Sequence, residues 1–270
     1  ADIWSKNKKW NWITDFRIMQ YPSLTYGLGI RSSIENATSL NYNYIKWHQT
    51  LLRAVNENLF IGGGIYFDGY SNVEEIDKEA GTISAFDRYG FATKSVNVGL
   101  IARVVYDNRI NPVNPAQGWY VNGVFRKNSD VLGSDNNTES LLFEVRKYLP
   151  FPAKSKNIIA FWSYNALTLA GKPYYLMLPS IGWDENYNTG RGYIQGRFRG
   201  KQMSYLETEY RFPITTNEKW GGVIFANAES FSKDIQTQFK SVAMGYGFGV
   251  RFQLNKHSKT NLCLDYGWGR

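Results

Sequence analysis

Cysteine and histidine are scarce in this 270-residue sequence, which contains one Cys, Cys263, and two His, His48 and His257. A single cysteine excludes an intramolecular disulfide framework and any zinc site built on several cysteines. Two histidines leave little material for a histidine-rich metal centre. The composition therefore gives no reason to expect a cofactor or a bound metal.

Long apolar runs are also missing. No stretch approaches the roughly 20 apolar residues that a membrane-spanning helix needs, which excludes a helical membrane protein. Aromatic residues are plentiful at 16%, which is more buriable surface than a disordered chain carries. Lys and Arg number 31 against 23 Asp and Glu, but they are dispersed along the sequence, which does not favour a nucleic-acid-binding face.

Alternation of apolar and polar residues recurs along the chain, whereas helical periodicity is nearly absent. It is clearest in residues 243–254, 203–212, 95–106 and 260–268. Further strands are expected near residues 9–19, 41–54, 58–70, 118–127, 139–149, 157–170 and 221–230. The sequence thus predicts an all-β chain of about 11–12 strands, forming one domain over residues 1–270.

The two faces of the strand at residues 243–254 differ in character. Tyr246, Phe248 and Val250 make one face apolar and suited to lipid. The opposite face is bare or polar, with Gly245, Gly247, Gly249 and Arg251. Such a glycine row allows either the close approach of another segment or strong curvature of the sheet, and the sequence leaves both possibilities open.

The connections between the expected strands alternate in length. The short ones are 55–57, 108–117, 150–156, 213–220 and 255–259. The long ones are 71–94, 128–138, 171–202 and 231–242. Strict alternation places all long loops at one end of the sheet, as in outer-membrane barrels and unlike most soluble sandwiches. Because unpaired backbone groups are costly in hydrocarbon, the prediction is a transmembrane, antiparallel, up-and-down β-barrel.

The longest connection has the most unusual composition. Its second half reads TGRGYIQGRFRGK, and the next strand places Glu207 and Glu209 on its polar face. A basic, glycine-rich loop before an acidic inward face indicates that the loop folds into the barrel, where an arginine can pair with a carboxylate. A solvated loop remains the alternative. Phosphate binding is less favoured, since no helix follows the loop.

Residues 189–201 and 203–213 resemble the bacterial surface antigen, or BamA/TamA-type, superfamily of outer-membrane β-barrels. Gly190-Arg191-Gly192-Tyr193 is similar to the [V/I]RG[F/Y] motif at the tip of that family's sixth extracellular loop. The resemblance implies that Arg191 reaches into the lumen and that Tyr193 packs the tip of the loop.

The resemblance also implies lumenal partners for Arg191. Glu209, four residues before Pro213, corresponds to one of the family's acidic partners. Asn227 stands where the family has an aspartate and is expected to be a hydrogen-bonding neighbour, while Glu207 lies on the same lumenal face.

A second segment is similar to the family's D-x-R-x-N-P…P-x-x-G-x-Y turn between central strands. Its matching residues are Asp107, Arg109, Pro112, Pro115 and Gly118. Two prolines and a glycine fix a tight turn, and Asp107 and Arg109 can pair beside it. We interpret this segment as structural.

The resemblance covers most of the chain from Tyr42 onward and implies a function. Family barrels have sixteen strands, so we expect either a short member without POTRA domains or the barrel part of a longer protein, lacking initial and final strands. The implied role is assembly, insertion or translocation of proteins at the outer membrane of Gram-negative bacteria. The implied partners are outer-membrane lipid, nascent outer-membrane or secreted proteins, and accessory lipoproteins.

Two alternatives remain at the sequence level. The barrel could serve only as a membrane anchor or pore for an attached periplasmic or surface domain. Catalysis inside the barrel would need a nucleophile with a positioned base. No serine or orienting acid can be assigned to His48, and His257 lies in a short turn. The sequence therefore predicts a protein that is not an enzyme.

Overall fold

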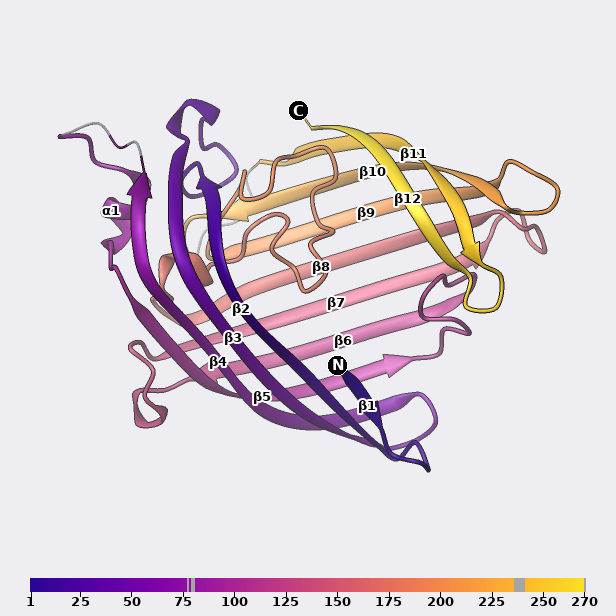
Figure 1. Ribbon diagram of the computed structural model, residues 1–270, viewed down its shortest axis with the longest axis horizontal. Helices are drawn as coiled ribbons and strands as arrows, with labels where there is room; N and C mark the ends of the chain where they lie inside the picture. Colours follow the sequence, from indigo (N-terminus) through magenta and orange to yellow (C-terminus); the bar gives the residue numbers. More distant parts are fainter. Residues whose placement is uncertain (77, 79–80, 236–240, 270) are drawn as a thin grey trace.

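The computed structural model describes residues 1–76, 78, 81–235 and 241–269. Within these ranges, twelve strands form one antiparallel sheet in which each strand pairs with its neighbours in sequence (Figure 1). The strands are β1 (Asp2–Trp4), β2 (Trp10–Thr25), β3 (Thr38–Ala54), β4 (Leu59–Ile76), β5 (Ser95–Asp107), β6 (Gly118–Asn128), β7 (Thr138–Pro150), β8 (Ile158–Gly171), β9 (Gln202–Pro213), β10 (Trp220–Ser232), β11 (Ala243–Asn255) and β12 (Thr260–Gly269). The described parts of the connections contain one α-helix, α1 (Ala85–Gly90), and three short 3₁₀ turns, η1 (Ile34–Asn36), η2 (Asp130–Leu132) and η3 (Tyr175–Met177).

The predicted all-β meander is confirmed, with differences at the N-terminal end. β1 has three residues, too few to show alternation in the sequence. β2 continues to Thr25 instead of ending near residue 19, because its second half stays paired with β3 from Ile18↔Ile45 to Thr25↔Thr38. β4 likewise continues to Ile76 through its ladder with β3.

The sheet curls strongly about one axis, as Figure 1 shows, and its concave side forms the lumen. β1 and β12 are its two edges, and no ladder joins them within the described residues. The curvature of the predicted barrel is therefore present, while the ring of hydrogen bonds is open at this point. A side-chain contact nearby joins two turns, since Asn111 Nδ2 donates to the Ser258 carbonyl at 3.1 Å.

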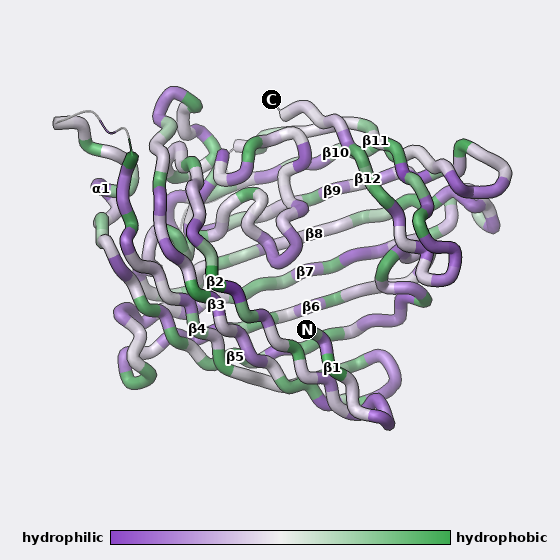
Figure 2. The backbone as a smooth tube through the Cα atoms, in the orientation of Figure 1, coloured by the Kyte–Doolittle hydropathy of each residue, from purple (hydrophilic) through white to green (hydrophobic). Residues whose placement is uncertain are grey.

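The two faces of the sheet follow the predicted alternation. The outward face exposes large apolar side chains such as Phe16, Ile18 and Leu264, and the green and purple segments of Figure 2 alternate along the strands. The concave face buries polar groups, among them Glu207, Glu209 and Asn227. An outward apolar face and a polar lumen are the pattern of a barrel surrounded by lipid.

Aromatic residues at the strand ends divide between the two faces. Trp119, Trp220 and Trp268 are exposed on the outward side, as a girdle at a membrane interface requires. Tyr148 is buried on the lumenal side, and the Tyr120 ring lies beneath the Arg109 guanidinium inside the barrel. Within the described residues, no helix is both long enough and apolar enough to cross a bilayer.

Candidate lumenal lock

The loop between β8 and β9, residues 172–201, lies against the concave face of the sheet (Figure 1). It is held together internally by an isolated bridge between Ser180 and Arg199. Asp184 caps its inner turn, because its carboxylate accepts hydrogen bonds from the Asn188 and Thr189 backbone amides at 3.0 and 2.8 Å. The Thr189 hydroxyl in turn accepts from the Gly182 amide at 2.8 Å. The loop is thus a folded element with its own hydrogen bonds.

Arg191 at the tip of this loop contacts three carboxylates. Its Nε and terminal nitrogens donate to the two oxygens of Glu207 at 3.0 and 2.7 Å, which is the bidentate geometry of a strong arginine–carboxylate pair. Arg191 also pairs with Glu209, and it reaches Asp265 on β12 at 3.1 Å. Burial lowers the pKa of the Arg191 guanidinium, but the adjacent carboxylates raise it more, so the net shift is upward.

Two further arginines complete the network. Arg211 Nε donates to Glu209 at 2.6 Å, and Arg251 donates to Asp265 at 3.1 Å. Three arginines, counting Arg191, therefore face three carboxylates. Because the desolvated charges balance and share hydrogen bonds, the cluster avoids the penalty of an isolated buried ion.

Asn227 lies beside this network without adding charge. Its side-chain amide donates to the Arg191 carbonyl at 2.8 Å, so it holds the backbone of the loop tip rather than the guanidinium. The family resemblance implies an aspartate at position 227. In this chain Asp265 on β12, two strands further along, supplies a carboxylate to Arg191 instead. The sequence analysis did not connect Asp265 with Arg191.

The glycine row on β11 and β12 receives the loop tip. A Cβ built on Gly245 would lie 2.8 Å from the Arg191 carbonyl oxygen, and one on Gly267 would lie 3.0 Å from the Gly192 nitrogen. Gly192 has φ +102°, a conformation that other residues rarely adopt. The Tyr193 hydroxyl donates to the Met244 carbonyl at 2.6 Å. Of the two possibilities left by the sequence, close approach is therefore present here.

The same loop also contacts the opposite side of the sheet. Tyr21 on β2 donates to Gln195 at 2.8 Å, and the Arg17 guanidinium lies over the Tyr187 ring at 5.3 Å. The Gly29 amide donates to the Arg199 carbonyl at 2.7 Å. The loop therefore spans the lumen from β9–β12 to β2.

The turn between β5 and β6 has the arrangement expected from its sequence. Arg109 forms a bidentate pair with Asp107, with distances of 2.8 and 2.7 Å, and stacks over Tyr120. Gly118 has φ +110°, and a Cβ there would lie 2.8 Å from the Asn108 carbonyl oxygen. Pro112 and Pro115 lie between these residues in the turn. Val113 and Asn114 in this turn line a cavity together with Arg211 and Arg251 of the Arg191 network.

A buried charge cluster that the sequence analysis missed lies on β3, β4 and β6. Asp68, only 2% exposed, accepts from Arg126 at 2.6 Å and lies 3.0 Å from His48 Nε2. Tyr44 donates to the same carboxylate, and the His48 ring stacks on Tyr66. The available signal was an aspartate in the middle of an apolar strand. Across the described ranges, no group of three or more His, Cys, Asp or Glu side chains is arranged to hold a metal ion.

The fold and this interior define a class of protein, namely a β-barrel with an apolar exterior whose own longest loop occupies the lumen. Residues 6–268 match the Omp85 superfamily domain, and the chain belongs to that superfamily. The resemblance to BamA/TamA-type barrels is thereby confirmed.

A solved structure supports the same fold. The crystal structure of BamA from Haemophilus ducreyi lacking POTRA domains 1–3 matches with a TM-score of 0.69 and 14% sequence identity. The match covers 96% of this chain and 55% of that one, so the chain spans about half the length of the BamA structure. No curated protein sequence matches the chain at a significant level.

Proposed function

We propose that this chain is an outer-membrane barrel that acts on other polypeptides, either inserting outer-membrane proteins or passing proteins across the membrane. The observation that carries the proposal is the grip on Arg191, which ties the loop tip to β9 and β12 through Glu207, Glu209 and Asp265. Its partners would be membrane lipid, nascent outer-membrane or secreted proteins, and accessory lipoproteins.

We call the contacts of Arg191 with Glu207, Glu209 and Asp265 the lumenal lock. The lumenal lock supports a conformational role for the barrel. The loop crosses the lumen and contacts β2 as well as β9–β12, so it braces two parts of the sheet that are distant in sequence. An unobstructed pore for small solutes would not need such a brace. In this proposal Arg191 fixes the loop, Glu209 and Glu207 are its charge partners, Asn227 holds the loop backbone, and Tyr193 packs the tip.

The test is a folding assay in lipid vesicles. The protein would be reconstituted, and the folding of an added, urea-denatured outer-membrane protein would be followed by its heat-dependent shift on a denaturing gel. The proposal predicts faster folding than in empty vesicles and a reduced effect for Arg191→Glu. A barrel that inserts correctly but leaves the folding rate unchanged would contradict it.

The second candidate is a barrel that only anchors, or provides a pore for, an attached periplasmic or surface domain. The superfamily match over residues 6–268 fits this function as well as the first one. Under this function, the same assay would show no acceleration, while the isolated barrel would still insert.

We do not propose an enzyme. His48 and Asp68 form a buried pair, but within the described part of the chain His48 forms no hydrogen bond with a serine, threonine or cysteine. Nucleophilic catalysis would need such a neighbour. Arg126 and Tyr44 instead direct the Asp68 carboxylate into a structural network.

A further inference from the structure

Positive charge is concentrated at one end of the barrel. The six short connections, residues 5–9, 55–58, 108–117, 151–157, 214–219 and 256–259, all lie at the same end of the meander. Together they carry nine Lys or Arg and two Glu, a net +7 out of +8 for the whole chain. The four long connections other than the lumenal loop, residues 26–37, 77–94, 129–137 and 233–242, carry six Lys or Arg and seven Asp or Glu. We call the six short connections the basic rim.

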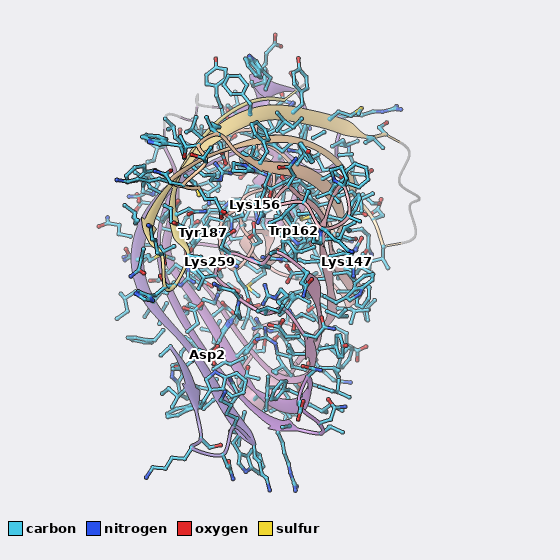
Figure 3. The ribbon with its side chains drawn as sticks, turned by 90° about the vertical axis from the view of Figure 1, so that its right-hand side faces the viewer. Asp2, Lys147, Lys156, Trp162, Tyr187 and Lys259 are labelled. Carbon is cyan, nitrogen blue, oxygen red and sulfur yellow. The ribbon has the colours of Figure 1, made fainter. Side chains whose placement is uncertain are left out.

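The lysines of the basic rim point into solvent. Eight of them are exposed, namely Lys6, Lys8, Lys9, Lys154, Lys156, Lys219, Lys256 and Lys259. Lys156 pairs with Glu218, whereas the other seven form no ion pair with any described residue. Figure 3 faces this end of the barrel, with Lys156 and Lys259 labelled, and purple stretches alternate with green and white ones in the turns there in Figure 2. These ammonium groups are free to bind an external anion.

Outward tryptophans lie directly beside the basic rim at three places around the sheet, each with a cation. Trp10 begins β2, and the Arg53 guanidinium lies 5.6 Å from its ring. Trp119 is the second residue of β6, and Lys147 Nζ lies 4.3 Å from the centre of its ring.

The third place is at the start of β10. The Trp220 ring packs on Phe252 at 4.8 Å, and Lys219 Nζ lies 5.2 Å from the same Phe252 ring. Tryptophan on a lipid-facing surface marks the level of the headgroups. The cations beside all three tryptophans are therefore at the depth where lipid phosphates lie.

We propose that the basic rim binds the phosphodiester headgroups of anionic phospholipids in the leaflet that the short turns face. This inference rests on the proposed membrane location. Clustered Lys and Arg next to a membrane surface are attracted to anionic lipid, and each contributes within a Debye length. The binding surface is the perimeter of the barrel, where ammonium groups and tryptophans occur together.

An acidic soluble protein is the competing occupant. Such a partner would need one contiguous patch, with hot-spot residues clustered near its centre. Here the cations follow the turns around the barrel, and the tryptophan–cation pairs occur on β2–β3, β6–β7 and β10–β11. This distribution fits a ring of lipids better than a single docked surface.

The experiment measures lipid selectivity at the protein boundary. The full-length protein would be reconstituted in phosphatidylcholine vesicles, and the association of spin-labelled phosphatidylglycerol would be compared with that of spin-labelled phosphatidylcholine. The test variant is Lys6→Gln, Lys154→Gln and Lys256→Gln combined. The control is Lys94→Gln, Lys172→Gln and Lys233→Gln combined, which removes the same charge at the long-loop end.

The proposal predicts a preference for phosphatidylglycerol of roughly three- to tenfold that weakens with salt, falls in the rim variant and persists in the control. Competition by added inorganic phosphate should not abolish it, because headgroups at the boundary are held by the bilayer. No preference, an equal preference in the rim variant, or an equal loss in the control would overturn the proposal.

The same samples separate this inference from the proposed function. Protein that inserts and shifts on heating but shows no lipid preference contradicts only the inference about the basic rim. Protein that fails to insert into any vesicle contradicts the membrane location itself, and the inference falls with it.

Discussion

Arg191, at the tip of the loop between β8 and β9, forms a bidentate ion pair with Glu207 on the lumenal face of β9, with distances of 3.0 and 2.7 Å. The two residues are close in sequence, but Arg191 lies in the loop and Glu207 lies on the strand that follows it. This pair fixes where the loop lies. Asp265 extends the grip to β12, so one side chain joins the loop to two strands that are not neighbours in the sheet.

Replacing Arg191 with glutamate should release the loop tip. The change leaves Glu207, Glu209 and Asp265 without their shared cation and adds a fourth negative charge, which should cost about 3–5 kcal/mol of loop stability. Limited proteolysis of the reconstituted barrel should then cleave within residues 172–201 several-fold faster. Arg88→Glu makes the same charge change outside the lumenal loop and should leave cleavage of this loop unchanged.

Replacing Gly245 with alanine should displace the loop by contact alone. The new methyl group would lie 2.5 Å from Asn227 Oδ1 and 2.8 Å from the Arg191 carbonyl oxygen, so the Asn227 side chain and the loop tip that it holds must both shift, at a cost of about 1–3 kcal/mol. Gly123→Ala is the matched control, because a Cβ there meets nothing within 4 Å. If the two alanine variants unfolded at the same temperature in a heat-shift gel series, the glycine would not be serving as a contact surface.

Replacing Asn227 with aspartate should weaken the lock, although it restores the residue type of the family pattern. An aspartate cannot donate to the Arg191 carbonyl, and it would add a negative charge to a network that is already balanced. The expected loss is about 1–3 kcal/mol, the cost of leaving a buried acceptor unpaired. Combining Asn227→Asp with Asp265→Asn should recover part of that loss in the same proteolysis assay, whereas an additive effect would show that the two positions are independent.

Replacing Arg126 with methionine should destabilise the barrel through a different cluster. Asp68 is almost fully buried and would lose its cationic partner, which should cost about 3–5 kcal/mol. Lys127→Met removes the next cation along β6, an exposed pair with Glu139 whose loss should cost less than about 1 kcal/mol. Urea unfolding in detergent micelles would compare the two, and similar midpoints would contradict the structural role of Arg126.

The sequence predicted most of the sheet because apolar outward residues recur with period two in most strands longer than β1. It also predicted the lumenal position of Glu209 and Asn227, which depends on parity along a single strand. Contacts between distant strands could not be predicted in this way. Asp265 contacts Arg191 only because the sheet curls. Asp68 contacts Arg126 because β4, β5 and β6 lie side by side, and the two side chains, on β4 and β6, are both on the lumenal face.

Cross-linking the loop to the wall of the lumen tests the central claim most directly. Asn188 in the loop and the native Cys263 on β12 line the same lumenal cavity of about 220 Å³. In an Asn188→Cys variant, a short bifunctional thiol reagent should therefore join the two cysteines and change the mobility of the heated, denatured protein. Removal of the native thiol by Cys263→Ser, or placement of the new cysteine at the exposed Val131 instead, should abolish the product. If the thiol introduced in place of Asn188 reacts readily with a monofunctional reagent but never cross-links to Cys263, the loop lies outside the barrel.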